Sequence, residues 1–333
     1  MTYSFDPSKK VFIVAEIGNN HEGSFDLAME MVEAAAKTGV DAVKFQTFIP
    51  EFFVSRDDEA RLERLNKFKL THDQFRKLEL RARELSLIFF STPLDIESAF
   101  FLNEIQPIFK ISSGDNDFYP LIKATASFNK PTIISSGIVD LNFIKNLVDY
   151  WHSVGGCDQN LAIMHCVSSY PAPQDQANLR AISTLKSSFP NLVIGYSDHT
   201  LGIRAAVFAV AAGARIIEKH FTLNKNQSDF RDHKLSADPA EMESLVLQIK
   251  EISELMGDGI KVLQPCEREM VTAMRRSIAA ARDLAAGDVV TLEDITWLRP
   301  GTGLSVGSEN QVIGKRTLTS LSRGNLIQLK NLF

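Results

Sequence analysis

The sequence contains little cysteine: Cys157, Cys166 and Cys266 are an odd number of widely spaced residues without a CxxC pair. Such a set supports neither a disulfide framework nor a zinc site made of cysteines. The roughly 20 consecutive apolar residues that a membrane-spanning helix needs are absent as well. The first residues also lack the apolar stretch and small-residue cleavage site of a signal peptide. We therefore expect a cytoplasmic protein without a membrane partner.

Several motifs of common protein classes are also missing. No GxGxxG, GxxxxGK[ST] or GxSxG pattern occurs, so a dinucleotide-binding fold, a P-loop and a serine hydrolase have no support. The net charge of −5 argues against a general nucleic-acid binder, because such a protein needs a basic face to contact phosphates. With 44% hydrophobic and 23% charged residues, the composition is that of an ordinary globular protein.

Short apolar runs alternate regularly with amphipathic stretches through most of the chain. The eight apolar runs are VFIVAE, DAVKFQT, LIFFST, PIFKISS, PTIISSG, LAIMHC, NLVIGYS and RIIEKH. The amphipathic stretches favour helices that start near Ser24, Thr71, Asp95, Tyr119, Asn142, Asn178, Gly202 and Pro239. Eight strands that are each followed by a helix predict an α/β fold, a (β/α)₈ TIM barrel, over residues 1–262.

The last part of the chain has a different pattern. A polar segment at 263–274, which contains Pro265, predicts a linker helix or strap. From 275 to 333, short β-like runs are separated by turn sequences such as Ala286-Gly287-Asp288 and Arg323-Gly324-Asn325. This pattern predicts a small β-rich carboxy-terminal domain.

Polar and charged side chains follow every predicted strand, at the end where barrel enzymes carry their chemistry. A purely structural protein has no reason to place such groups at the same end of all eight strands, so the pattern indicates a catalytic site. In chain order these residues are Glu16, Asn19, Asn20, His21, Lys44, Gln46, Ser91, Thr92, Lys110, Ser112, Ser113, Asp115, Ser135, Ser136, His165, Ser168, Tyr170, Ser197, Asp198, His199, Glu218 and His220.

Two lysines stand out in this set. Lys44 and Lys110 end different strands, and each is followed by hydroxyl or amide side chains. A single lysine at such a position is usually a solvated or salt-bridged surface residue. Two of them, together with Ser113, Ser135 and Ser197, predict a binding site for a phosphate or carboxylate dianion.

Two histidines close the seventh and eighth predicted strands. Because these strands are neighbours in a barrel, His199 and His220 can converge on one divalent ion, assisted by the nearby Asp198, Glu218 and Asp232. Two buried, hydrogen-bonded histidines are the structural alternative. A mixed nitrogen and oxygen site suits Mn²⁺, Zn²⁺, Fe²⁺ or Co²⁺ and leaves coordination positions open, as a Lewis-acid site requires.

Among the other histidines, His72 and His152 fall on predicted helices at the surface, and His21 lies where it could contact substrate. His233 is expected in a loop after the eighth strand.

Seven motifs give the chain a family resemblance: AEIGNNHEGSFDLA, DAVKFQTF, STPLD, FKISSGD, HCVSSYPAP, GYSDHT and EKHFT. In this order they resemble the sialic acid synthase family, which includes legionaminic and pseudaminic acid synthases. The stretches RRSIAAARDLAAGDVVTLEDITWLRPGTG and GKRTLTSLSRGNLI resemble the antifreeze-like, or SAF, domain of that family. The resemblance covers nearly the whole chain.

The resemblance implies roles for individual residues. Lys44, Lys110, Ser113, Ser135 and Ser197 match phosphoenolpyruvate-binding positions, with Thr92 and Tyr170 near its carboxylate. His199 and His220 match metal ligands, with Mn²⁺ placed first and Mg²⁺ or Co²⁺ as alternatives. Glu16, Asp232 and Arg299 match positions that meet the sugar, and Arg299 would reach into the partner's barrel in a domain-swapped homodimer.

The implied reaction joins phosphoenolpyruvate to a sugar aldehyde, N-acetylmannosamine or a diacetylated dideoxy sugar, with Glu16 and Asp232 handling protons. The identity of the acceptor sugar is left open, because the sequence departs from the family pattern at two places. The stretch Gln227 to His233 lacks the Gly-Pro pair of many members, and Asp115 and Ser168 stand where some have Glu and Asn. Two rival functions are a Schiff-base aldolase, with Lys44 or Lys110 as nucleophile, and a non-catalytic carbohydrate-binding or ice-binding protein.

Overall fold

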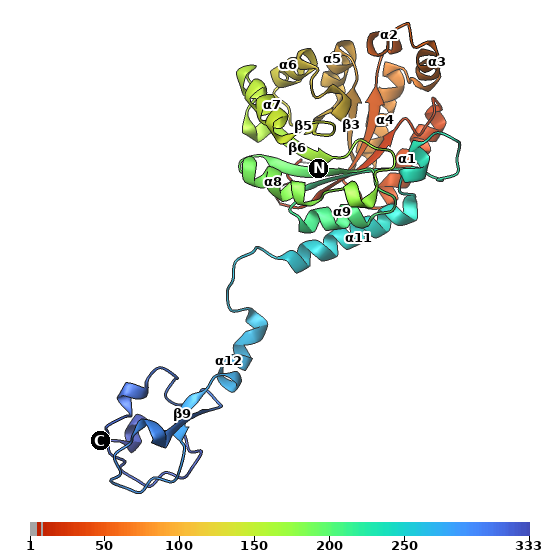
Figure 1. The fold of residues 1–333 in the computed structure, drawn as a ribbon. Coiled ribbons are helices and arrows are strands. Elements are labelled where there is room, and N and C mark those ends of the chain that lie inside the picture. The colour runs from red at the N-terminus through yellow and green to blue at the C-terminus, as the bar shows by residue number, and fades with distance from the viewer. Residues whose placement is uncertain (1–4, 8) are drawn as a thin grey trace. The chain divides into compact units, whose positions relative to one another are not determined.

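The computed structural model describes residues 5–7 and 9–333, and the chain forms two compact units that divide between Gly257 and Asp258. The first unit contains eight parallel strands in the order β3-β2-β1-β8-β7-β6-β5-β4, with β3 next to β4. Helices surround this sheet (Figure 1). The predicted (β/α)₈ barrel is confirmed.

Every strand of the barrel coincides with one of the eight predicted apolar runs. The strands are β1 Phe12–Gly18, β2 Ala42–Thr47, β3 Ile88–Pro93, β4 Phe109–Ile111, β5 Thr132–Ser135, β6 Leu161–Cys166, β7 Val193–Asp198 and β8 Ile216–His220. Their parallel pairing places all eight carboxyl ends at the same end of the barrel.

The main helices begin close to the predicted positions. They are α1 Phe25–Lys37, α4 His72–Glu84, α5 Ile96–Ile105, α6 Tyr119–Ser127, α7 Leu141–Ser153, α8 Arg180–Ser188, α9 Arg204–Ala211 and α11 Pro239–Met256. In α1, the Ser24 side chain accepts a hydrogen bond from the amide of Leu27 and so caps the helix start. The buried face of α1, which carries Met31 and Val32, packs into the core around the sheet.

Three further helices were not predicted: α2 Pro50–Phe53, α3 Glu59–Phe68 and α10 Asp232–Leu235. The first two lie between β2 and α4. The third corrects the prediction that Asp232 and His233 lie in a loop, because both belong to the single turn of α10. Short 3₁₀ helices in this unit are η1 Ser113–Asp115, η2 Asp158–Asn160 and η3 Gln174–Gln176.

The interior of the barrel has an apolar lower part and a polar upper part. Phe12, Val14, Ala42, Phe90 and Met164 belong to a separate buried cluster. Since side chains alternate along a strand, the residues two positions farther on face the same side. These next residues are polar in most strands, so the apolar cluster forms the floor of a polar site.

The second unit contains η4 Pro265–Glu267 and α12 Arg268–Met274, which occupy the predicted linker. An antiparallel pair, β9 Ser277–Ala280 and β10 Ile295–Leu298, follows, with η5 Leu292–Asp294, η6 Glu309–Gln311 and η7 Leu329–Asn331. Ile278, Val290, Val312 and Ile327 form part of its core, so this unit has an apolar centre of its own. Across residues 5–7 and 9–333, no helix has the length and apolar character needed to cross a membrane.

Candidate active site

A cavity of ≈ 730 Å³ opens at the carboxyl ends of the barrel strands. This volume is in the range of small-molecule sites. The residues matched to substrate or metal positions all line it, apart from Arg299: Glu16, Lys44, Thr92, Lys110, Ser113, Asp115, Ser135, Tyr170, Ser197, His199, His220 and Asp232. Six of the other strand-end residues do not line it: Asn20, His21, Ser91, Ser136, His165 and Asp198. The structure therefore brings together residues from all eight strands and their loops.

Lys44 and Lys110 do lie close together, but a carboxylate stands between them. The Glu218 carboxylate lies 2.9 Å from the Lys44 ammonium and accepts two hydrogen bonds of 2.9 Å from Lys110. Ser197 donates a further hydrogen bond of 2.9 Å to the same carboxylate. Glu16 approaches Lys44 to 3.5 Å. The expected pair of lysines is thus a compact cluster of two cations and two acidic side chains.

Burial and mutual charge shift the pKa of each member of this cluster. Burial raises the pKa of Glu16 to about 7, against the opposing effect of Lys44. Burial would also raise the pKa of Glu218, but Lys110 and Lys44 hold it well below its usual range. Glu218 is therefore ionised, whereas Glu16 can take up or release a proton near neutral pH.

The pKa values of the two lysines also shift in opposite directions. Burial would lower the pKa of Lys44, but the charges of Glu16 and Glu218 raise it above its ordinary value. In Lys110 burial prevails and lowers the pKa to about 8, with Glu218 opposing and Lys44 assisting. Lys44 is a permanent cation, and Lys110 can lose its charge in mildly alkaline solution.

Several buried polar atoms of the cavity make no hydrogen bond with any described residue. They are Oδ1 of Asn19, Oγ1 of Thr92, Oγ of Ser135 and Nδ1 of His220. A buried polar atom without a partner costs about 1–3 kcal/mol, so such atoms are rare in a folded protein. Four of them around one cavity indicate that a polar ligand completes their hydrogen bonding.

His199 and His220 meet at the ends of β7 and β8, with ring centroids 5.4 Å apart. The carbonyl of Val167 accepts a hydrogen bond of 2.9 Å from Nδ1 of His199, so Nε2 is the atom left to bind a ligand when this ring is neutral. Burial would lower the pKa of His199, but Cys166 and the Val167 carbonyl raise it above its ordinary value. Burial lowers the pKa of His220 well below its ordinary value and keeps that ring neutral. A neutral imidazole is the form that binds a metal ion.

The acidic residues that were expected to assist these histidines do so only in part. Asp198 points away from the cavity and pairs with Lys219 at 3.0 Å, and Glu218 pairs with the lysines. Asp232 is the one acid of the three that lines the cavity without pairing with a lysine, and its carboxylate accepts a hydrogen bond of 3.2 Å from the Arg231 guanidinium. Within the ranges 5–7 and 9–333, no three His, Cys, Asp or Glu side chains form a metal-binding group. The two imidazoles fit an open site in which water or substrate supplies the other ligands.

The remaining histidines have structural roles or lie at the surface. His72 and His152 are exposed, as predicted. His165 lies 2.9 Å from the Ala177 carbonyl and does not line the main cavity. The expectation that His21 contacts substrate is wrong for this cavity, because its ring is buried outside the lining and accepts a hydrogen bond from the Gly23 amide.

Several lining residues escaped the sequence analysis. Arg61, Arg64 and Phe68 of α3, with Phe53 of α2, form part of the outer wall. Phe230 and Arg231 complete it, and the Arg231 guanidinium lies 4.7 Å from the centre of the Tyr170 ring. The only sequence signal for the residues of α2 and α3 was a charged amphipathic stretch between the second and third apolar runs, which is typical of any exposed helix. Phe230 and Arg231 lie in the stretch from Gln227 to His233, which drew attention only as a departure from the family pattern.

Arg299 belongs to the second unit, directly after β10. Its side chain is exposed. The role expected for it therefore stays a prediction, as do the individual roles of the residues that line the cavity.

Comparisons with known proteins agree with this architecture. The NeuB family model matches residues 31–261, and the SAF domain model matches residues 275–332. The N,N'-diacetyllegionaminic acid synthase of Campylobacter jejuni is 38% identical over 334 residues, which cover 96% of this chain and 99% of the relative. The human N-acetylneuraminate-9-phosphate synthase is 32% identical, over 95% of this chain and 91% of the relative.

A solved structure supports the same relationship. The N-acetylneuraminic acid synthetase of Leptospira borgpetersenii superposes with a TM-score of 0.75 at 35% identity, and the match covers 79% of this chain and 90% of that chain. The resemblance found in the sequence motifs is confirmed. The chain is an enzyme that belongs to the NeuB family of sialic acid synthase-type proteins and ends in a SAF domain.

Proposed function

We propose that the chain condenses phosphoenolpyruvate with a sugar aldehyde to give a nine-carbon 2-keto-3-deoxy sugar acid and phosphate. One observation carries the proposal: a buried pair of lysines and a pair of histidines share one cavity at the barrel mouth. The lysines suit a phosphorylated carboxylic acid, and the histidines suit a metal ion beside an aldehyde oxygen. N-acetylmannosamine is the first candidate acceptor, and a diacetylated dideoxy sugar is the alternative.

Phosphoenolpyruvate would bind over the lysine cluster. Lys44 and Lys110 supply the positive charge, while the unpartnered hydroxyls of Ser135 and Thr92 are available as donors. Ser113, Ser197 and Tyr170 line the same region. Because ionised Glu218 already occupies one face of both ammonium groups, the ligand would share the lysine protons with it.

His199 and His220 would hold the divalent metal, with Mn²⁺ first and Mg²⁺ or Co²⁺ as alternatives. A metal ion bound there would act as a Lewis acid toward the acceptor carbonyl. The chain's own contribution is to present two imidazoles with free nitrogen atoms and to keep His220 neutral by burial.

The bond changes balance without an external oxidant or reductant. C3 of phosphoenolpyruvate bonds to the aldehyde carbon, a water oxygen bonds to C2, and the C2–O bond breaks as phosphate leaves. Glu16, whose pKa is raised to about 7, can accept the proton of that water or return it. Asp232 faces the same cavity and, together with the Arg231 guanidinium at 3.2 Å, can orient the acceptor hydroxyls.

Phosphate release from phosphoenolpyruvate tests this function directly. The assay compares N-acetylmannosamine, its diacetylated dideoxy analogues and simple pentoses, with mass spectrometry of the products. Bridging ¹⁸O in phosphoenolpyruvate should appear in phosphate if the C2–O bond breaks. Trapping of pyruvate by borohydride would instead favour the Schiff-base aldolase, and sugar binding without turnover would favour the non-catalytic protein.

The proposal includes a domain-swapped homodimer in which Arg299 serves the partner's barrel. The exposed guanidinium stands at the end of β10, just before Pro300-Gly301. A guanidinium can bond an acyl oxygen and a hydroxyl in one fixed fork, which a lysine cannot reproduce. The expected cytoplasmic location likewise stays a prediction.

Complementation between two inactive variants is the test of the swap. We expect co-refolding of Arg299→Ala with His220→Ala to restore activity to roughly a quarter of the wild-type level or less. One of the two sites in a mixed dimer then receives both an intact barrel and an intact arginine. Each variant refolded alone is the control. Mixed dimers that have demonstrably formed but stay inactive would show that Arg299 does not act on a partner's site.

A further inference from the structure

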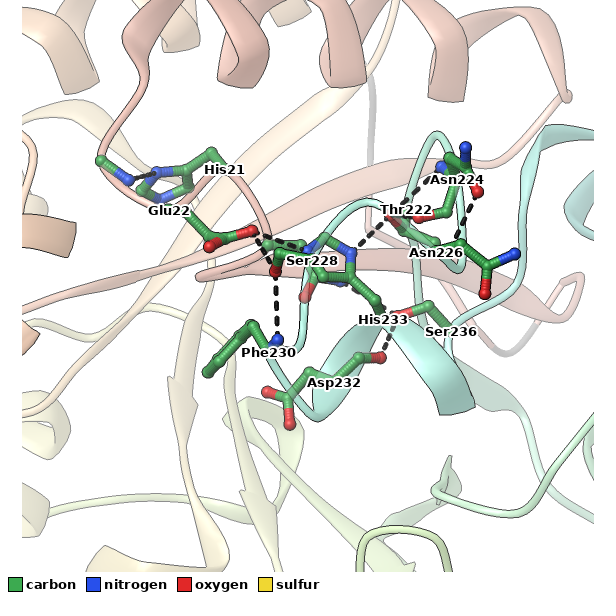
Figure 2. A network of polar contacts seen from close by, with 12 residues as sticks. His21, Glu22, Thr222, Asn224, Asn226, Ser228, Phe230, Asp232, His233 and Ser236 are labelled. Atoms are coloured by element: carbon green, nitrogen blue, oxygen red, sulfur yellow. Dashed lines mark hydrogen bonds and ion pairs between the residues drawn. The ribbon is translucent and has the colours of Figure 1, made fainter.

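A polar network joins the loop after β1 to the segment between β8 and α11 (Figure 2). Its centre is Oε1 of Glu22, which accepts a hydrogen bond of 2.7 Å from Ser228 and lies 3.0 Å from Nε2 of His233. A carboxylate can only accept here, so the Nε2 atom of His233 carries the hydrogen. We call Glu22, Ser228 and His233 the clasp.

The clasp is anchored at both of its ends. His233 is fully buried, and its other ring nitrogen lies 2.7 Å from the hydroxyl of Thr222, two residues after the end of β8. On the other side, the Glu22 backbone has a positive φ of 48°, a conformation that is uncommon outside glycine. The side chain of Glu22 is therefore presented by a defined turn and not by a flexible stem.

A second contact from the same loop supports the clasp. The buried Asn20 amide donates hydrogen bonds to the Phe221 carbonyl at 2.8 Å and to the Ser236 hydroxyl at 3.0 Å. Ser236 in turn donates to the Asp232 carbonyl at 2.6 Å. The first loop thus holds the beginning, the middle and the end of the segment from 221 to 236.

The held segment carries part of the cavity wall. Ser228 accepts a hydrogen bond of 3.0 Å from the Phe230 amide, so the clasp fixes the backbone where the wall residues begin. Phe230, Arg231 and Asp232 all line the active-site cavity, whereas none of the clasp residues does. Glu22 and Ser228 line a second cavity of ≈ 760 Å³, which shares Phe230 and Arg231 with the first. Figure 2 shows the Asp232 carboxylate on the opposite side of the backbone from the clasp.

We propose that the clasp of Glu22, Ser228 and His233 positions the wall formed by Phe230, Arg231 and Asp232 and so determines how well the cavity accepts its sugar substrate. The proposal rests on the proposed function, because the sugar is assigned to this wall there. The clasp residues are positioning residues, since they touch the wall and not the cavity. The lysine cluster makes no contact with the clasp among the described residues, so phosphoenolpyruvate binding should be independent of it.

A matched pair of substitutions at Glu22 tests the proposal. Glu22→Ala removes the hydrogen bonds that Ser228 and His233 make to this carboxylate. We expect the acceptor KM to rise about tenfold, which corresponds to about 1.4 kcal/mol, while the KM for phosphoenolpyruvate stays within about twofold. Glu22→Gln keeps an acceptor oxygen for Ser228 and His233, so its acceptor KM should stay near the wild-type value. Ser228→Ala should give an intermediate rise.

Glu30→Ala is the control, because it removes a carboxylate from an exposed position of α1 that lies outside the network. A rise of both KM values together in Glu22→Ala, or an equal defect in Glu22→Gln, would overturn the proposal. Both results would mean that the substitution damages the whole site or acts through charge alone.

Amide hydrogen exchange separates this proposal from the proposed function. Exchange over residues 222–236 should accelerate in Glu22→Ala and remain at the wild-type rate in Glu22→Gln and Glu30→Ala. Unchanged exchange in Glu22→Ala would show that the clasp does not hold the segment. A wild-type enzyme that releases no phosphate from phosphoenolpyruvate with any sugar aldehyde would refute the proposed function, and with it the clasp's role in sugar selection.

Discussion

Replacing His199 or His220 by alanine is expected to lower kcat by at least about 10³-fold, because a Lewis-acid metal ion is worth several kcal/mol to a reaction at a carbonyl. The two rings lie side by side at the ends of the neighbouring strands β7 and β8, with centroids 5.4 Å apart. Each variant should also lose Mn²⁺ binding, measured by calorimetry or electron paramagnetic resonance without any substrate. The melting temperature should change little, because the removed ring edges face the cavity and not the apolar core.

His165→Ala is the matched control for the histidine variants. This residue stands on the neighbouring strand β6, is also buried, and contacts the Ala177 carbonyl outside the main cavity. It should keep Mn²⁺ binding even if it loses some stability. Wild-type activity that survives exhaustive chelation, or Mn²⁺ binding that survives in both cavity variants, would contradict the metal assignment.

Much of the barrel could be predicted because its information is local. Each strand is a short apolar run, and each polar residue at its end follows the two-residue alternation of the strand. Glu16 follows Phe12 and Val14 on one face, and Lys44 follows Ala42 in the same way. Residues at the ends of eight such runs can therefore be predicted to meet at one end of a barrel, even before their side-chain contacts are known.

The pairings inside the site could not be predicted in this way. Glu218 and His220 both face inward on β8, and the sequence alone gave no reason for one to pair with lysines and the other to face His199. That choice depends on which side chains of β2, β4 and β7 surround each position. The clasp was missed for the same reason, because Glu22 and His233 are separated by 211 positions in the chain.

Removing the Glu218 carboxylate should have a large effect on stability. Glu218→Ala leaves the Lys44 and Lys110 ammonium groups buried beside each other, with Glu16 as their remaining acidic neighbour at 3.5 Å from Lys44. Removal of one partner from a buried ion pair typically costs about 3–5 kcal/mol. We expect a loss of that order in the free energy of unfolding, measured with urea at pH 7. Glu218→Gln keeps the shape and one acceptor oxygen, so it should lose less.

The pH dependence of this loss distinguishes a charge effect from a packing effect. The pKa of Lys110 is already lowered to about 8, and loss of the Glu218 charge, which opposes that shift, should lower it further. In the unfolded chain a lysine keeps its proton up to about pH 10.4, so folding of Glu218→Ala must release a proton. Stability therefore rises with pH wherever the unfolded state binds more protons. The deficit relative to wild type should be largest in mildly acidic solution and shrink as the pH approaches 9.

Phosphoenolpyruvate supplies the second half of the test. A bound trianion would replace the missing carboxylate between the two lysines, and a ligand that binds only the folded state stabilises it by RT ln(1 + [L]/Kd). Saturating phosphoenolpyruvate should therefore stabilise Glu218→Ala more than it stabilises wild type, where the ligand has to share the lysine protons with Glu218. An equal or smaller gain in the variant, or a deficit that does not change with pH, would show that Glu218 acts through packing and that the lysines do not form the anion site.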